Sequence, residues 1–115
     1  NSFNDMPLNS DMIEVYDPSS QKIINTYSIG TPRTFAAATA IDNSIFVFGG
    51  HNGIQAINSA EKFTIDNDNI ETKELAKLPT ELKHVEAVTW NNVILLSGGY
   101  RDNNESQAQC YFYYP

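Results

Sequence analysis

The side chains that could bind a metal ion or act as nucleophiles are few in this chain. Two histidines, His51 and His84, and a single cysteine, Cys110, stand far apart in the sequence. Metal centres built from such residues normally contain ligand pairs only a few positions apart, so these three are not expected to form one. We therefore predict no metal site and no cofactor.

A polar run, Asp66-Asn67-Asp68-Asn69, is similar to the first residues of a calcium-binding loop. Such a loop needs glycine at its sixth position and glutamate at its twelfth, where this chain has Glu71 and Lys77. The run is therefore interpreted as a turn. Neither a Gly-x-Ser-x-Gly motif, a Cys-x-x-Cys motif nor a phosphate-binding loop occurs, and we predict that the chain is not an enzyme.

The charge of the chain argues against nucleic acid as a partner. Seven Lys and Arg residues stand against fourteen Asp and Glu, the net charge is −7, and the basic residues form no cluster. An acidic surface repels phosphate backbones. No apolar run reaches the roughly 18 residues that cross a bilayer, so no membrane contact is expected. A single cysteine cannot form an internal disulfide, which favours a cytoplasmic protein.

The most informative feature is an internal repeat. Residues 41–50 (IDNSIFVFGG) align without a gap on residues 90–99 (WNNVILLSGG), at an offset of 49 residues. Each copy contains an apolar residue, a polar turn, an apolar run and two glycines. The residues before each copy, 36–40 and 85–89, also match, because both alternate small and branched side chains.

A second element keeps nearly the same period. Glu14-Val15-Tyr16-Asp17-Pro18 corresponds to residues 61–65 and 111–115, and the aromatic residues Tyr16, Phe63 and Tyr113 stand 47 and 50 residues apart. A period near 50, made of strand-length segments and turns, is typical of the four-stranded blade of a β-propeller.

The pattern predicts an all-β chain with strands near residues 36–41, 45–48, 57–64, 70–75, 85–90 and 93–97, and almost no helix. The triplet Asp42-Asn43-Ser44 is expected to close the first hairpin. The two glycines after each hairpin are expected to be structural, because they allow positive backbone angles or close contacts that a side chain would prevent. These glycines are Gly49, Gly50, Gly98 and Gly99.

These residues resemble the kelch repeat, in which a double glycine precedes a Glu-x-Tyr-Asp-Pro stretch and an arginine opens the repeat. The double glycines match the first feature, residues 14–18 match the second, and Arg33 lies 16 residues before Gly49. Ile23 and Ile70 stand where the family usually has tryptophan, and Leu82 replaces the second arginine. The resemblance covers nearly the whole chain from about Asp11 and implies kelch-type β-propeller blades, which are four-stranded antiparallel sheets.

We therefore expect residues 1–115 to belong to one kelch β-propeller domain. Residues 11–30 would form the end of one blade, residues 31–78 a complete blade and residues 79–115 most of a third. Propellers close with about four to eight blades, so the ring is incomplete here. Because repeat units bury their apolar faces against neighbours, the remaining blades are expected in the same polypeptide or from other chains.

Candidate binding residues fall in loops that should share one end of the blades. Alternate connections of an up-and-down sheet emerge at the same end, so the loops after the double glycines and the loops between blades form one loop face. Loops on a rigid scaffold often bind partners, and this composition suits a peptide or protein. The candidates are Arg33, His51, Asn52, Lys83, His84, Tyr100, Arg101, Asp102 and Asn103. For any one of them, an ordinary solvated loop position is the alternative, and for Arg33 a structural role within its blade is a further one.

The sequence thus indicates a protein-interaction module, a scaffold that binds a protein or peptide through its loop face. The resemblance implies partners such as a substrate recruited to a ubiquitin ligase, actin or other cytoskeletal proteins, or neighbours in a large assembly. The alternative is a carbohydrate-binding or sugar-modifying propeller. Secretion with glycosylation at Asn104, which opens an Asn-Glu-Ser acceptor, would favour this alternative.

Overall fold

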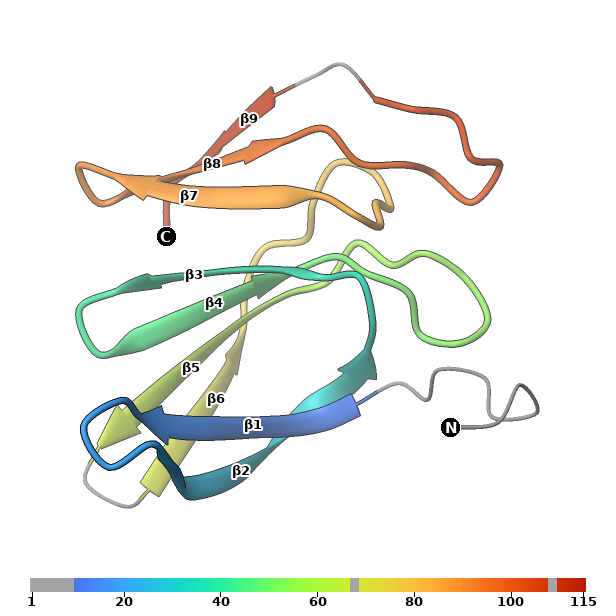
Figure 1. Cartoon of the computed structure of the whole chain (residues 1–115). Coiled ribbons are helices and arrows are strands. Elements are labelled where there is room, and N and C mark those ends of the chain that lie inside the picture. The colour runs from blue at the N-terminus through green and yellow to red at the C-terminus, as the bar shows by residue number, and fades with distance from the viewer. Residues whose placement is uncertain (1–9, 67–68, 108–109) are drawn as a thin grey trace.

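The computed structural model describes residues 10–66, 69–107 and 110–115, and in these ranges the chain forms nine strands and no helix. The strands make three antiparallel sheets, β1–β2, β3–β6 and β7–β9, that follow one another in the sequence (Figure 1). The prediction of an all-β chain is confirmed. Within the same ranges, no helix capable of spanning a membrane is found.

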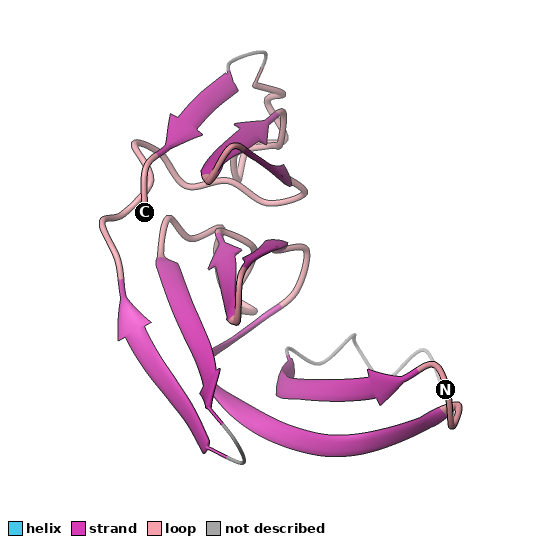
Figure 2. Ribbon diagram, turned by 90° about the vertical axis from the view of Figure 1, so that its left-hand side faces the viewer, coloured by secondary structure: helices cyan, strands magenta, loops and turns pink. Residues whose placement is uncertain are grey.

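The first sheet is a hairpin of β1 (Ser10–Asp17) and β2 (Lys22–Arg33). The carboxylate of Asp17 holds its turn by accepting hydrogen bonds from the Ser19 amide at 3.0 Å and the Ser20 hydroxyl at 3.1 Å. Residues 30–33, which the sequence placed in a loop between blades, belong to β2. The hairpin is turned away from the other two sheets (Figure 2).

The second sheet contains β3 (Ala37–Ile41), β4 (Ser44–Phe48), β5 (Ala60–Asp66) and β6 (Asn69–Glu74) in sequential order. Ile41 pairs with Ser44, so the predicted hairpin has a loop of only two residues. Asp42 has a φ of 54°, in agreement with the positive angles that such tight turns require. The polar run of residues 66–69, which the sequence predicted to be a turn, lies partly outside the described residues.

The third predicted strand begins later than its apolar pattern indicated. Residues 57–59 lie outside β5 because their backbone groups are bonded to neighbouring loops. The Ile57 amide donates to the Gly50 carbonyl at 2.9 Å, and the Gly49 amide donates to the Ser59 carbonyl at 2.9 Å. The Ile57 carbonyl also accepts from the Leu82 amide at 3.2 Å. The segment therefore closes the loop between β4 and β5 on itself, joins it to the loop between β6 and β7, and does not extend the strand.

The third sheet contains β7 (Glu86–Trp90), β8 (Val93–Ser97) and β9 (Cys110–Tyr113). Its hairpin loop, Asn91-Asn92, has φ values of 50° and 61°, which asparagine adopts more readily than most residues. The strands 86–90 and 93–97 agree with the sequence prediction to within one residue. Among the described residues this sheet has three strands, in contrast to the four of the second sheet.

The hydrophobic core lies between the second and third sheets. Its buried members are Ala37, Phe46, Phe48, Ala60, Leu78, Leu82, Val85, Ile94 and Leu96. Each fully buried large side chain contributes roughly 1.5–3 kcal/mol. The strands β3 and β7 lie side by side (Figure 1), where the hydroxyls of Thr39 and Thr89 are 2.7 Å apart and Thr89 also donates to the Ala40 carbonyl at 3.1 Å. Apolar packing and a short polar chain therefore join the two sheets.

The double glycine of the second sheet lies at this junction. All four repeat glycines have positive φ values, as the sequence predicted. A Cβ atom at Gly49 would lie only 2.5 Å from the Leu82 carbonyl oxygen, which accepts a hydrogen bond from the Gly50 amide at 2.7 Å. The segment that enters the third sheet therefore runs directly over Gly49 and Gly50.

Candidate functional site

The loop face forms where two pairs of loops run side by side. Thr34 and His51 exchange backbone hydrogen bonds of 3.0 and 2.8 Å, and Lys83 and Tyr100 do the same at 2.9 and 2.8 Å. The loops after β4 and β8 project from the same end of the two sheets (Figure 1). The structure therefore brings together His51, Asn52, Lys83, His84 and Tyr100, each in the kind of loop that the sequence indicated.

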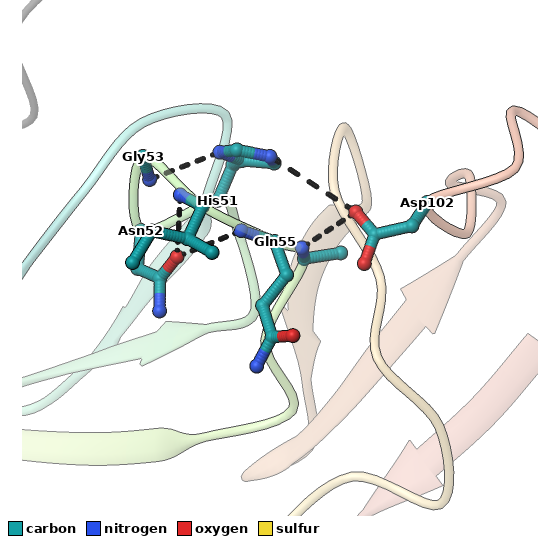
Figure 3. Close-up of polar contacts among 7 residues, drawn as sticks. His51, Asn52, Gly53, Gln55 and Asp102 are labelled. Carbon is teal, nitrogen blue, oxygen red and sulfur yellow. Dashed lines mark hydrogen bonds and ion pairs between the residues drawn. The ribbon is translucent and has the colours of Figure 1, made fainter.

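Asp102 connects the loops of the two sheets. Its Oδ1 atom accepts a hydrogen bond of 2.7 Å from the Ala56 amide and lies 4.0 Å from Nε2 of His51 (Figure 3). Ala56 is almost fully buried, so its amide would be costly to leave unpaired. The Nδ1 atom of His51 accepts from the Gly53 amide at 3.0 Å, which leaves Nε2 directed at Asp102. Asp102 thus holds one loop against the other.

Two of the candidate asparagines shape their own loops. Oδ1 of Asn52 accepts from the amides of Ile54 and Gln55, both at 2.9 Å (Figure 3). Oδ1 of Asn103 accepts from the Glu105 amide at 2.9 Å. The side-chain oxygens of both residues are therefore used within tight turns, so Asn52 and Asn103 stabilise their own loops.

Three aromatic rings form the most distinctive part of the loop face. The rings of Phe35 and His84 are stacked at 4.1 Å between centroids, and His84 meets Tyr100 edge-to-face at 5.9 Å. Phe35 is 50% exposed and Tyr100 43% exposed. We call these three residues the aromatic cluster.

The backbone at the aromatic cluster is strained. Phe35 and His84 both have a φ of 58°, which is uncommon for bulky residues, and the His84 amide donates to the Phe35 carbonyl at 2.8 Å. Phe35 is not among the residues that the sequence indicated, although it is equivalent to the candidate His84 at the 49-residue offset, which is the signal that could have identified it. Glycine would adopt this angle without cost. The presence of a ring side chain at both positions therefore indicates that the rings themselves have a role.

Arg33 does not belong to the exposed loop face. It is 6% exposed, forms an ion pair with the buried carboxylate of Glu61, and donates from Nη1 to the Gly49 carbonyl at 3.0 Å. Burial lowers the pKa of Arg33, and the neighbouring Glu61 acts in the opposite direction. Arg33 therefore lies in the interior of its blade, in agreement with the structural alternative for this residue, and is not part of the exposed surface. A guanidinium can satisfy a carboxylate and a carbonyl at once, which explains its place in the interior.

The remaining candidates, Lys83 and Arg101, are cations. Arg101 is exposed and its amide donates to the Glu105 carbonyl at 3.1 Å, whereas Lys83 is half-buried. In the part of the chain that the structure describes, no group of three His, Cys, Asp or Glu side chains could hold a metal ion. The arrangement offers aromatic surface, hydrogen-bonding groups and separated charges, which are the elements of protein recognition.

Comparison with known proteins agrees with the repeat. A family model described as the kelch motif matches residues 32–68. The chain belongs to the kelch-repeat family. It is also 33% identical over 79 residues to alpha-scruin from Limulus polyphemus, an alignment that covers 67% of this chain and 8% of that protein. The chain thus spans about 8% of the length of this relative. The kelch match confirms the predicted family and the four-stranded antiparallel blade.

Proposed function

We propose that this chain is a protein-interaction module whose partner binds the loop face. The observation that supports this most directly is the aromatic cluster, because three rings are held in fixed positions and remain accessible to solvent. Aromatic residues that are already ordered lose little entropy on binding and are enriched at the centres of interfaces. The partner would therefore place its main contact residues on Phe35, His84 and Tyr100.

The loop face is supported by a scaffold that keeps its loops in register. Backbone bonds join Thr34 to His51 and Lys83 to Tyr100, and Asp102 ties the loop of one sheet to the loop of the next. This rigidity favours recognition of a preformed surface or an extended peptide. Arg101, Lys83, Asn52 and Asn103 would supply polar contacts around the rings.

The division into blades forms part of this proposal. Residues 11–30 would end one blade, residues 31–78 would form a complete blade and residues 79–115 most of the next, so the loop face would continue over further blades. The candidate partners are those that the kelch resemblance implies, namely ubiquitin-ligase substrates, cytoskeletal proteins such as actin, and partners in large assemblies. The chain would act in the cytoplasm as a scaffold without an enzymatic reaction of its own.

Co-sedimentation with filamentous actin is a direct first test of a cytoskeletal partner. We expect the complete protein to sediment with the filaments, and Tyr100→Ala combined with His84→Ala to weaken this binding at least tenfold, which is about 1.4 kcal/mol. The loss arises because two rings of the aromatic cluster are removed. Circular dichroism should show that both proteins remain folded.

Lys73→Ala is the matched control, because Lys73 is exposed on β6 away from the loop face. It should bind as the wild type does. If actin binding is absent, the cytoskeletal partner is rejected, and the same three proteins are compared for partners identified by chemical cross-linking in cells. A partner that binds the double variant and the wild type equally would contradict the loop face as the binding surface.

A further inference from the structure

The loop that follows β4 contains the single asparagine–glycine pair of the chain, Asn52-Gly53. In such a pair the backbone nitrogen of the second residue can attack the side-chain carbonyl carbon of the first, because glycine has no Cβ atom to obstruct the approach. The attack closes a succinimide ring and releases ammonia. How readily this happens depends on the groups that surround the attacking nitrogen and the carbonyl.

A base contacts the nitrogen that would attack. The Gly53 amide donates a hydrogen bond of 3.0 Å to Nδ1 of His51 (Figure 3). An Nδ1 atom that accepts a hydrogen bond is unprotonated, and Asp102 is the charged group that faces the other ring nitrogen, Nε2, at 4.0 Å. The ring therefore carries its proton on the side of Asp102 and presents a basic nitrogen to Gly53. The distance is within the range over which a general base takes up a proton.

The carbonyl under attack is held by two further hydrogen-bond donors. Oδ1 of Asn52 accepts from the backbone amides of Ile54 and Gln55, both at 2.9 Å (Figure 3). As the ring closes, an electron pair of this carbonyl moves onto Oδ1, and the two amides stabilise the negative charge. Backbone amides at such distances are the groups that stabilise the oxyanion in acyl transfer. Both ends of the reacting pair are thus activated within one loop.

We propose that the loop after β4 promotes the deamidation of its own Asn52, with His51 as the general base and two backbone amides of the same loop as the oxyanion site. Nδ1 of His51 takes the proton of the Gly53 amide while the Gly53 nitrogen bonds to Cγ of Asn52. The tetrahedral carbon then expels Nδ2, which receives the proton from His51 and leaves as ammonia. Water opens the succinimide at Cγ to give aspartate, or at the backbone carbonyl carbon to give isoaspartate.

The two products change the loop face in different ways. Aspartate adds a negative charge at residue 52 and keeps an oxygen for the amides of Ile54 and Gln55. Isoaspartate inserts a methylene group into the main chain before Gly53, which moves these amides relative to the side chain. Asp102 contacts the same loop, so the new carboxylate brings like charges together there. The modification does not depend on a partner bound to the loop face.

The loop after β8 offers a reference in which the base is replaced by a carbonyl. Oδ1 of Asn103 accepts from the Glu105 amide at 2.9 Å, as Oδ1 of Asn52 accepts within its own loop. The nitrogen that would attack Asn103 is that of Asn104, and its amide donates to the Arg101 carbonyl at 2.9 Å. A backbone carbonyl does not take up a proton at neutral pH. Asn103 should therefore deamidate without assistance.

Asn104→Gly makes this reference a matched control. The substitution gives the loop after β8 an asparagine–glycine pair, and glycine readily adopts the φ of 62° found at Asn104. The attacking nitrogen at this pair remains bonded to a carbonyl. The two loops then share the reacting sequence and differ in the base.

The test follows the deamidation of the complete protein near neutral pH by peptide mapping with mass spectrometry. Asn52 should convert at least about tenfold faster than in a synthetic peptide of residues 48–58, because a positioned general base contributes about 100-fold to 10,000-fold. The peptide has the same local sequence without the fold. Residue 103 of Asn104→Gly should convert at least about tenfold more slowly than Asn52.

His51→Asn removes the base and keeps a hydrogen-bond acceptor. The side-chain oxygen of asparagine can accept from the Gly53 amide but does not take its proton, so deamidation of Asn52 should slow at least about tenfold. In the unaltered protein the rate should rise with pH and level off once the His51 ring is fully neutral. In the variant it should rise with hydroxide concentration throughout. Circular dichroism checks that the variant is folded, and the pH profile of the unaltered protein tests the base without any substitution.

Three results would overturn the proposal. Deamidation of Asn52 in the complete protein at the rate of the peptide would show that the fold gives no assistance. Equal rates with His51 and with His51→Asn, or a rate in the unaltered protein that follows hydroxide concentration throughout, would exclude His51 as the base. Conversion of residue 103 in Asn104→Gly as fast as that of Asn52 would show that the asparagine–glycine sequence suffices without a base.

Discussion

The second and third sheets of this protein are built from the same repeat but have different surroundings. Gly49 and Gly98 have similar φ values of 63° and 72°, yet Leu82 lies over Gly49 and no heavy atom approaches the corresponding position at Gly98. Phe48 is fully buried, whereas Ser97 replaces it in the third sheet. The repeat therefore fixes the local backbone, and the neighbouring sheet determines which residues are buried.

The comparison also shows where the two copies have diverged. Ala37 and Phe48 of the second sheet fit a closely packed junction, and Glu86 and Ser97 at the same places bring a charge and a small polar group. A surface that packs on Glu86 and Ser97 would therefore differ from the one that packs on Ala37 and Phe48.

The largest expected effect concerns the chain in isolation. Residues 1–115 expressed alone should not form a stable soluble monomer, because Val88, Trp90 and Phe112 lack a covering layer. Each such side chain contributes roughly 1.5–3 kcal/mol when buried, against a domain stability of only about 5–15 kcal/mol. Sedimentation provides the measurement. A monodisperse species of 12.8 kDa with cooperative unfolding would show that these three side chains need no cover.

Removal of a ring at the covered junction is expected to have the next largest effect. Phe48→Ala should lower the free energy of unfolding of the complete protein by about 3–5 kcal/mol, because Phe48 is fully buried and packs edge-to-face on Tyr113. Chemical denaturation measures the change. A small loss for Phe48→Ala would contradict the assignment of the core.

Alanine at the double glycine tests the close approach of Leu82. A positive φ costs a non-glycine residue about 1–2 kcal/mol, and Gly49→Ala adds a contact of 2.5 Å with a backbone oxygen, so its cost should exceed that range. Gly98→Ala, where φ is 72° and a Cβ atom would meet no heavy atom within 4 Å, should show the backbone cost alone. Melting temperatures of the two variants that change equally would refute the steric role of Gly49.

Valine at the second glycine of each pair compares the two sheets directly. Gly50→Val and Gly99→Val should each cost on the order of 1–3 kcal/mol. Gly50→Val should cost more, because a Cβ atom would lie 2.7 Å from the Thr34 carbonyl oxygen, against 3.2 Å from the Lys83 oxygen at Gly99. An unchanged melting temperature for either variant would contradict a structural role for that glycine.

The smallest expected effect is at the link between the loops. Asp102→Ala should lower the free energy of unfolding by about 1–3 kcal/mol, because the buried Ala56 amide loses a charged acceptor. Hydrogen exchange at the Ala56 amide should rise in the variant, and Glu105→Ala should leave it unchanged. Protection that persists without Asp102 would show that the loops are held together by other contacts.

The amino-acid sequence by itself determined the repeat, the family, most strands and the positive φ at the four glycines. These features depend on patterns within a few residues, namely apolar alternation, tight polar turns and double glycines, repeated at a period of 49. The start of β5 was placed three residues too early because Ile57 satisfies the apolar pattern while its backbone bonds to Gly50 and Leu82.

Only the tertiary structure decided which of the loop residues are exposed and which are interior. Arg33 lies in a loop-like, polar stretch of sequence but is buried, because Glu61 and the Gly49 carbonyl come from β5 and from the end of β4 to satisfy it. In its local sequence Phe35 is an ordinary apolar residue. Its ring stacks on that of His84 only because the two sheets pack together. Local pattern fixes backbone shape, whereas burial and pairing depend on segments that meet only when the sheets pack.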